Sequence, residues 1–154
     1  AKAIDRGSEY GLRMVDMPYW SFHVSPEQAV ENAGRFVHEA NAEVMKCEGN
    51  RYHARNIEAI VQAGVPVQGH IGITPMRMPQ LGGFIAQGKT SEKAKALVEA
   101  AHAFVDAGCF ISVARHVQPK YFYNGTRSRS SQIQAQSRGS KELEFKIFAN
   151  VKLI

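Results

Sequence analysis

Four ionisable side chains stand at or near the ends of short apolar runs, and helix-length segments separate those runs. In chain order they are Asp16, Lys46, Glu48 and His70. Enzymes built from repeated strand–helix units collect their reactive groups at the carboxyl ends of parallel strands. Two carboxylates, an ammonium and an imidazole brought to one edge therefore predict a site for a hard metal ion and an anionic small molecule.

Each of these side chains also has a plainer interpretation. Asp16 and Glu48 could cap the following helices or face solvent. Lys46 precedes Glu48 by two positions, so both share one strand face, where the lysine suits a substrate carboxylate or an ordinary surface salt bridge. His70 stands between two glycines and could bind a ligand or be a packed, hydrogen-bonded histidine. The residues alone leave these alternatives open.

The apolar pattern predicts the elements that must position these groups. Strands are expected at 12–15, 43–48, 65–69 and 109–114, and helices at 1–10, 25–40, 55–63 and 91–107. Ser25 and Pro26 suit the cap and first turn of the second helix. Such alternation indicates parallel strands joined by right-handed crossovers, which makes the fold class α/β, either a barrel or an open sheet. Four strands are too few to close an eight-stranded barrel, so a barrel would be partial.

Charge divides the chain into two parts. Basic and acidic residues are equal in number over residues 1–115, so the net charge of +5 arises in residues 116–154. Residues 124–139 are rich in Ser, Gln and Arg, and such a segment buries too little apolar surface to offset its ordering entropy. We therefore predict a strand–helix domain at 1–115 and an unrelated basic, poorly ordered tail at 116–154, in which 143–154 could form a strand or an exposed apolar end.

Composition also bounds the partners and the compartment. Apolar runs reach nowhere near the roughly 18 residues of a membrane span, and no secretory signal pattern is visible. Cys47 and Cys109 lie in apolar runs, which predicts buried free thiols and a reducing compartment, cytoplasmic or, in a eukaryote, mitochondrial. The Ser/Arg segment offers nucleic acid only unspecific, salt-sensitive attraction, so nucleic acid is not an expected partner.

Longer stretches carry a more specific signal. They are, in order, Asp16-Met17-Pro18-Tyr19, Ser25-Pro26-Glu27-Gln28-Ala29, Lys46-Cys47-Glu48-Gly49, Gly69-His70-Ile71-Gly72-Ile73-Thr74-Pro75, Gln80-Leu81-Gly82-Gly83-Phe84 and Gln87-Gly88-Lys89. In this combination, residues 1 to about 114 closely resemble the ketopantoate (3-methyl-2-oxobutanoate) hydroxymethyltransferase family. The resemblance implies a (β/α)8 barrel of the phosphoenolpyruvate/pyruvate superfamily, with about four βα units at 1–115, and a homodecamer.

The resemblance also implies a reaction and roles for the four residues. The family transfers a hydroxymethyl group from 5,10-methylenetetrahydrofolate to the small α-keto acid α-ketoisovalerate, giving 2-dehydropantoate for pantothenate biosynthesis through a Mg²⁺-stabilised enolate. By this resemblance Asp16 and Glu48 contact the metal, and Asp16 and Lys46 bind the substrate. His70 lies in the active site with its role open. A metal-chelated keto acid has an acidified C–H bond, which agrees with this chemistry.

The sequence departs from the family pattern in two places. The family's Asp-Ser pair would precede Ala1, and Ala1 in place of a methionine indicates a processed or incomplete chain. The family's general-base glutamate would stand at Arg115, whose guanidinium is no base at neutral pH. Beyond that position both the match and the apolar pattern fade. The alternative function is therefore a catalytically inactive, truncated or frameshifted remnant that at most assembles with full-length subunits.

The loss of both signals near one position motivates a hypothesis about the gene. We expect a shifted reading frame, a retained intron or a degraded gene near codons 110–120. Sequencing matched genomic and transcript DNA across this region tests the hypothesis. An uninterrupted in-frame gene that encodes this tail would contradict it.

Overall fold

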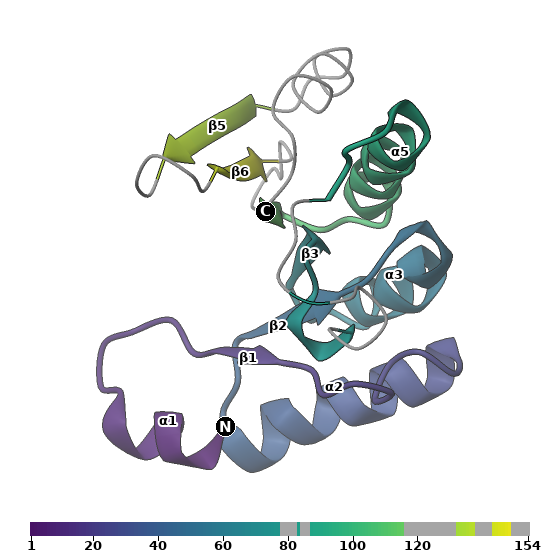
Figure 1. The fold of residues 1–154 in the computed structure, drawn as a ribbon. Coiled ribbons are helices and arrows are strands. Elements are labelled where there is room, and N and C mark those ends of the chain that lie inside the picture. The colour runs from purple at the N-terminus through teal and green to yellow at the C-terminus, as the bar shows by residue number, and fades with distance from the viewer. Residues whose placement is uncertain (78–82, 84–86, 116–131, 138–142, 149–154) are drawn as a thin grey trace.

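Parallel strands joined by helices form the centre of the chain. A computed structural model describes residues 1–77, 83, 87–115, 132–137 and 143–148 (Figure 1). The strands that follow the predicted pattern are β1 Met14–Asp16, β2 Val44–Glu48, β3 Val67–Gly72 and β4 Ile111–Arg115. Each pairs in parallel with its neighbour along the chain. The predicted α/β class is confirmed.

Helices connect these strands on one side. They are α2 Pro26–Ala40, α3 Ala54–Gln62 and α5 Ser91–Asp106; α1 Lys2–Gly7 precedes β1, and the short 3-10 turns η1 Arg51–His53 and η2 Pro75–Arg77 follow β2 and β3. Helices α2, α3 and α5 follow one another in chain order along the same side of the strands (Figure 1). Every helix of the described ranges falls short of the length and apolar character that crossing a bilayer requires.

The boundaries of α2 follow from local chemistry. The Ser25 hydroxyl accepts a hydrogen bond from the Gln28 N–H at 3.2 Å, so the predicted cap is confirmed. The Gln28 side chain accepts the N–H of Val24, one residue earlier than a capping box would use. The helix ends at Asn41, which adopts the left-handed conformation with φ of 46°. Together these contacts fix the ends of the helix that follows β1.

The core lies between the strands and these helices. Because side chains alternate along a strand, one face of β1, β2 and β3 supplies the apolar layer. Its buried members include Val15, Met45, Cys47, Val67 and Ile71, which share one cluster with Ile57, Ile60 and Phe104 from the helices. Lys46, Glu48 and His70 lie on the opposite face of these strands.

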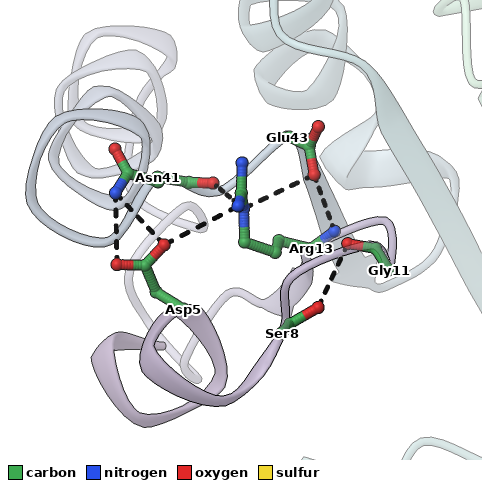
Figure 2. Close-up of polar contacts among 6 residues, drawn as sticks. All are labelled: Asp5, Ser8, Gly11, Arg13, Asn41 and Glu43. Atoms are coloured by element: carbon green, nitrogen blue, oxygen red, sulfur yellow. Dashed lines mark hydrogen bonds and ion pairs between the residues drawn. The ribbon is translucent and has the colours of Figure 1, made fainter.

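A polar network fixes α1 at the amino ends of β1 and β2. The Asn41 amide donates to both carboxylate oxygens of Asp5 at 3.1 Å, and the Arg13 Nε donates to the Asn41 carbonyl at 2.7 Å. The Arg13 N–H donates to Glu43 at 2.9 Å, and the Arg13 guanidinium lies between the two carboxylates (Figure 2). Because these side chains are partly exposed, the network contributes modestly to stability and mainly orients α1.

Two further strands extend the sheet. They are β5 Gln132–Ser137 and β6 Leu143–Phe148, and the sheet order is β1-β2-β3-β4-β6-β5. Strand β6 pairs antiparallel with β4, and β5 pairs antiparallel with β6. Strand β5 lies in the segment for which poor order was predicted, whereas β6 agrees with the strand that was one of the two alternatives for 143–154. In this position β6 gives the backbone of β4 hydrogen-bonding partners that an open edge would lack. The other residues of 116–154 lie outside the described ranges, and the boundary at 115 stays a prediction.

Both cysteines are free and buried, as predicted. Burial raises the pKa of Cys109 to about 12, against a weaker opposing hydrogen bond from the Gly69 backbone. Burial also raises the pKa of Cys47, and nearby Cys109 and Asp16 raise it further. An unfolded thiol ionises near pH 8.5, so the thiol form favours folding below that pH. This stabilisation is lost as the pH rises from about 8.5 towards 12.

We predict that both thiols resist DTNB at mildly alkaline pH in the folded chain and react fully in concentrated urea. The physical reason is that burial excludes the reagent and suppresses the reactive thiolate. Absorbance of the released thiophenolate measures the reaction. Rapid modification without denaturant would contradict the packing of Cys47 and Cys109.

Candidate functional site

Strand register brings the four predicted side chains into one row. Asp16 in β1 pairs with Lys46 in β2, and Glu48 in β2 pairs with His70 in β3. Lys46 and Glu48 are two residues apart and so share a strand face. This is the face opposite the apolar layer of Met45 and the other core residues. His70 lies inside β3, because the strand extends to Gly72 rather than ending at the predicted residue 69.

The Lys46 ammonium connects the two carboxylates. Its Nζ forms a close ion pair with Oδ1 of Asp16 and lies 3.5 Å from Oε1 of Glu48. The Asp16 side chain is 51% exposed, whereas that of Glu48 is 4% exposed. The cluster therefore runs from solvent at Asp16 to the interior at Glu48, with Lys46 between them.

Glu48 is held on both of its oxygens. His70 Nδ1 lies 3.1 Å from Oε1, and the Met76 N–H donates to Oε2 at 3.3 Å. Burial alone would raise the pKa of Glu48, but the hydrogen bond and electrostatic attraction of His70, then the Met76 N–H and the Lys46 ammonium, outweigh it. The pKa is lowered, so the side chain is a carboxylate at neutral pH. A carboxylate only accepts hydrogen bonds, so the His70 Nδ1 carries the proton.

The other ring nitrogen of His70 has a different environment. The His70 side chain is 1% exposed, and its Nε2 is buried without a hydrogen-bond partner among the described residues. A buried polar atom without a partner destabilises the folded state. The structure therefore combines the packed, hydrogen-bonded histidine of the plainer interpretation with a ring atom left over for a ligand.

Three other residues lie at or near this edge of the sheet. Gln68 is the register partner of Lys46 and was missed, although its spacing of two from His70 was a usable signal. The Met76 contact is made by the backbone, so its residue type gave no signal. Arg115 is the last residue of β4 and pairs with Gly72, and its side chain lies outside the described part.

The donor chemistry fits a hard cation shared with a ligand. Mg²⁺ takes oxygen ligands and often binds through one or two carboxylates, with waters or substrate completing the octahedron. Asp16 and Glu48 supply two such carboxylates beside one ammonium. No group of three or more His, Cys, Asp or Glu side chains suited to a metal occurs in the described ranges. Any such ion would therefore depend on ligands from outside this pair.

Charged side chains near the carboxyl ends of parallel strands are typical of enzymes built from strand–helix units. The sequence model of the ketopantoate hydroxymethyltransferase family matches residues 1–123, and the chain belongs to this family. Its relatives carry the name of a transferase, as predicted.

Individual relatives agree with this assignment. The 3-methyl-2-oxobutanoate hydroxymethyltransferase of Syntrophobacter fumaroxidans is 50% identical over 108 residues, which are 70% of this chain and 38% of that protein. The enzyme of the same name from Dehalococcoides mccartyi CBDB1 is 48% identical over 112 residues, 73% of this chain and 40% of that protein. The enzyme of that name from Clostridioides difficile is 44% identical over 119 residues, which are 77% of this chain and 43% of that protein. The chain thus spans about 40% of the length of the curated relatives it matches.

We predict that Lys46→Met lowers the free energy of unfolding by about 1–2 kcal/mol, because it leaves the buried carboxylate of Glu48 without its cation. The matched control is Arg35→Met, which breaks the exposed pair with Glu39 at 3.1 Å. That change should cost at most about 0.5 kcal/mol. Urea unfolding followed by circular dichroism measures both. Equal losses would mean that Lys46 is an ordinary surface lysine.

Proposed function

We propose that this chain carries metal- and substrate-binding residues of a 3-methyl-2-oxobutanoate hydroxymethyltransferase. The reaction would transfer a hydroxymethyl group from 5,10-methylenetetrahydrofolate to α-ketoisovalerate and give 2-dehydropantoate. The observation that carries the proposal is the shared contact of Asp16 and Glu48 with the Lys46 ammonium. It supports a common position for two carboxylates and a cation at one edge of the sheet.

The proposed architecture is part of a (β/α)8 barrel. Strands β1 to β4 follow one another in the sheet in chain order, and the connecting helices follow one side of the strands (Figure 1). A doubly wound sheet would instead reverse its strand order and place helices on both faces. The uninterrupted order therefore supports the barrel type of winding.

Each residue of the row has a proposed task. Asp16 and Glu48 would hold Mg²⁺, and Asp16 would also contact the keto acid. Lys46 would bind the substrate carboxylate through its ammonium, which the ion pairs with Asp16 and Glu48 hold at this edge. The bound ion would supply Lewis-acid polarisation of the keto group. The decameric assembly and the cytoplasmic or mitochondrial location stay predictions.

A second candidate function is a catalytically inactive remnant that assembles with full-length subunits. The observation that favours it is Arg115 at the end of β4, where the family resemblance leads us to expect the general-base glutamate. A guanidinium stays protonated at neutral pH and cannot abstract a proton from carbon. Under this alternative the chain would at most assemble with full-length subunits and would turn nothing over.

Binding of α-ketoisovalerate in the presence of Mg²⁺, measured by calorimetry on the full chain, tests the proposal. We expect Asp16→Asn and Lys46→Gln each to weaken binding about tenfold or more, because each removes a charge that would face the ligand. Asp5→Asn makes the same chemical change at the amino edge of the strands and should leave binding unchanged. Equal effects of Asp5→Asn and Asp16→Asn, or binding that ignores Mg²⁺, would contradict the proposed site.

Turnover separates the two candidates. Because of Arg115, we expect little or no ketopantoate from the purified chain supplied with both substrates and Mg²⁺. Robust Mg²⁺-dependent formation of ketopantoate would overturn the remnant and establish the transferase activity in this chain.

A further inference from the structure

His70 is a polar side chain buried within β3. Its neighbours along the sheet face include Glu48, which is its register partner in β2. The histidine side chain is 1% exposed and its Nε2 has no partner in the described part of the chain. Packing alone therefore gives no reason for an imidazole at this position.

The contact that does account for the imidazole is the one to Glu48. His70 Nδ1 lies 3.1 Å from Oε1 of Glu48, the same oxygen that lies 3.5 Å from the Lys46 ammonium. The Met76 N–H holds the second oxygen at 3.3 Å. Because both oxygens have a hydrogen-bond partner, the rotation of the Glu48 carboxylate about its Cγ–Cδ bond is fixed. One lone-pair site of Oε1 is left, and the Lys46 Nζ lies 3.5 Å from this oxygen.

We propose that His70 is a positioning residue, whose Nδ1–H holds the Glu48 carboxylate in the orientation that receives a divalent cation. The role rests on the proposed function, because the cation is the one that Asp16 and Glu48 would hold there. Partners that orient a ligating carboxylate typically change metal affinity 10- to 100-fold when removed.

The first arm of the test needs no metal. Two-bond ¹H–¹⁵N NMR spectra of the full chain report which nitrogen of each imidazole carries the proton. We expect the His70 signals of the Nδ1–H tautomer, and their loss in Glu48→Leu, since free imidazoles favour the other tautomer in water. An Nε2–H tautomer at His70 in the unaltered chain would overturn the proposal.

The second arm compares three substitutions of similar size. In His70→Asn the amide nitrogen takes the place of Nδ1, and in His70→Gln it takes the place of Nε2, whereas His70→Leu fills the volume without a donor. Mn²⁺ affinity, measured by electron paramagnetic resonance, should fall at least tenfold in the Leu and Gln variants. His70→Asn should stay within about threefold of the unaltered chain, because the donor to Glu48 is kept. Equal affinities in the Asn and Leu variants would overturn the proposal.

A stability control separates orientation from general loosening of the fold. Asn56 is also buried, and its amide donates to the Phe22 carbonyl at 2.9 Å rather than to a carboxylate. Asn56→Leu should lower the thermal midpoint as His70→Leu does and leave Mn²⁺ affinity unchanged. A parallel loss of affinity in Asn56→Leu would assign the effect of His70 to stability alone and overturn the positioning role.

The two arms also distinguish this inference from the proposed function. If the unaltered chain binds no Mn²⁺ and Asp16→Asn changes nothing, the proposed metal site fails. In that case an Nδ1–H tautomer that depends on Glu48 would still support the positioning of the carboxylate by His70.

Discussion

The buried carboxylate of Glu48 imposes the strongest constraint on this edge of the molecule. A charge that is removed from water is tolerated only where hydrogen bonds and an opposite charge replace its hydration. Glu48 obtains these from three separate elements: Lys46 in its own strand, His70 in β3 and the Met76 backbone in η2. Moving any of these elements would remove one of the contacts that compensate the charge. The spacing of β2, β3 and η2 is therefore tied to one side chain.

A polar cluster lies at each end of the strands. At the amino ends, Asp5, Arg13 and Asn41 fasten α1 through partly exposed polar contacts (Figure 2). At the carboxyl ends, Asp16 and Glu48 share one ammonium across neighbouring strands. Both clusters use acidic and basic side chains, so residue type does not tell them apart. What differs is burial, since Glu48 loses its hydration and the partners of the first cluster retain much of theirs.

Alternation along the strands explains how one short sheet serves two purposes. Met45 and Cys47 point to the helices and join the apolar core, whereas Lys46 and Glu48 point to the other side. Parallel register repeats this arrangement in the neighbouring strand, where Val67 belongs to the core. A shift by one residue would move every charge into the core, so the apolar layer fixes the register that assembles the site.

The sequence alone determined the order of the elements from α1 to β4, the cap of α2, the buried thiols and the family, because each is encoded locally by periodicity, by a capping side chain or by a run of characteristic residues. It also placed Asp16, Lys46, Glu48 and His70 near strand ends. Only the tertiary structure decided that Lys46 contacts both carboxylates and that His70 contacts Glu48, because contacts between strands depend on register. The Met76 contact and the pairing of β6 with β4 are made by backbone groups. Nearly every residue carries the same backbone N–H and C=O groups, so residue types do not indicate which of these groups form hydrogen bonds.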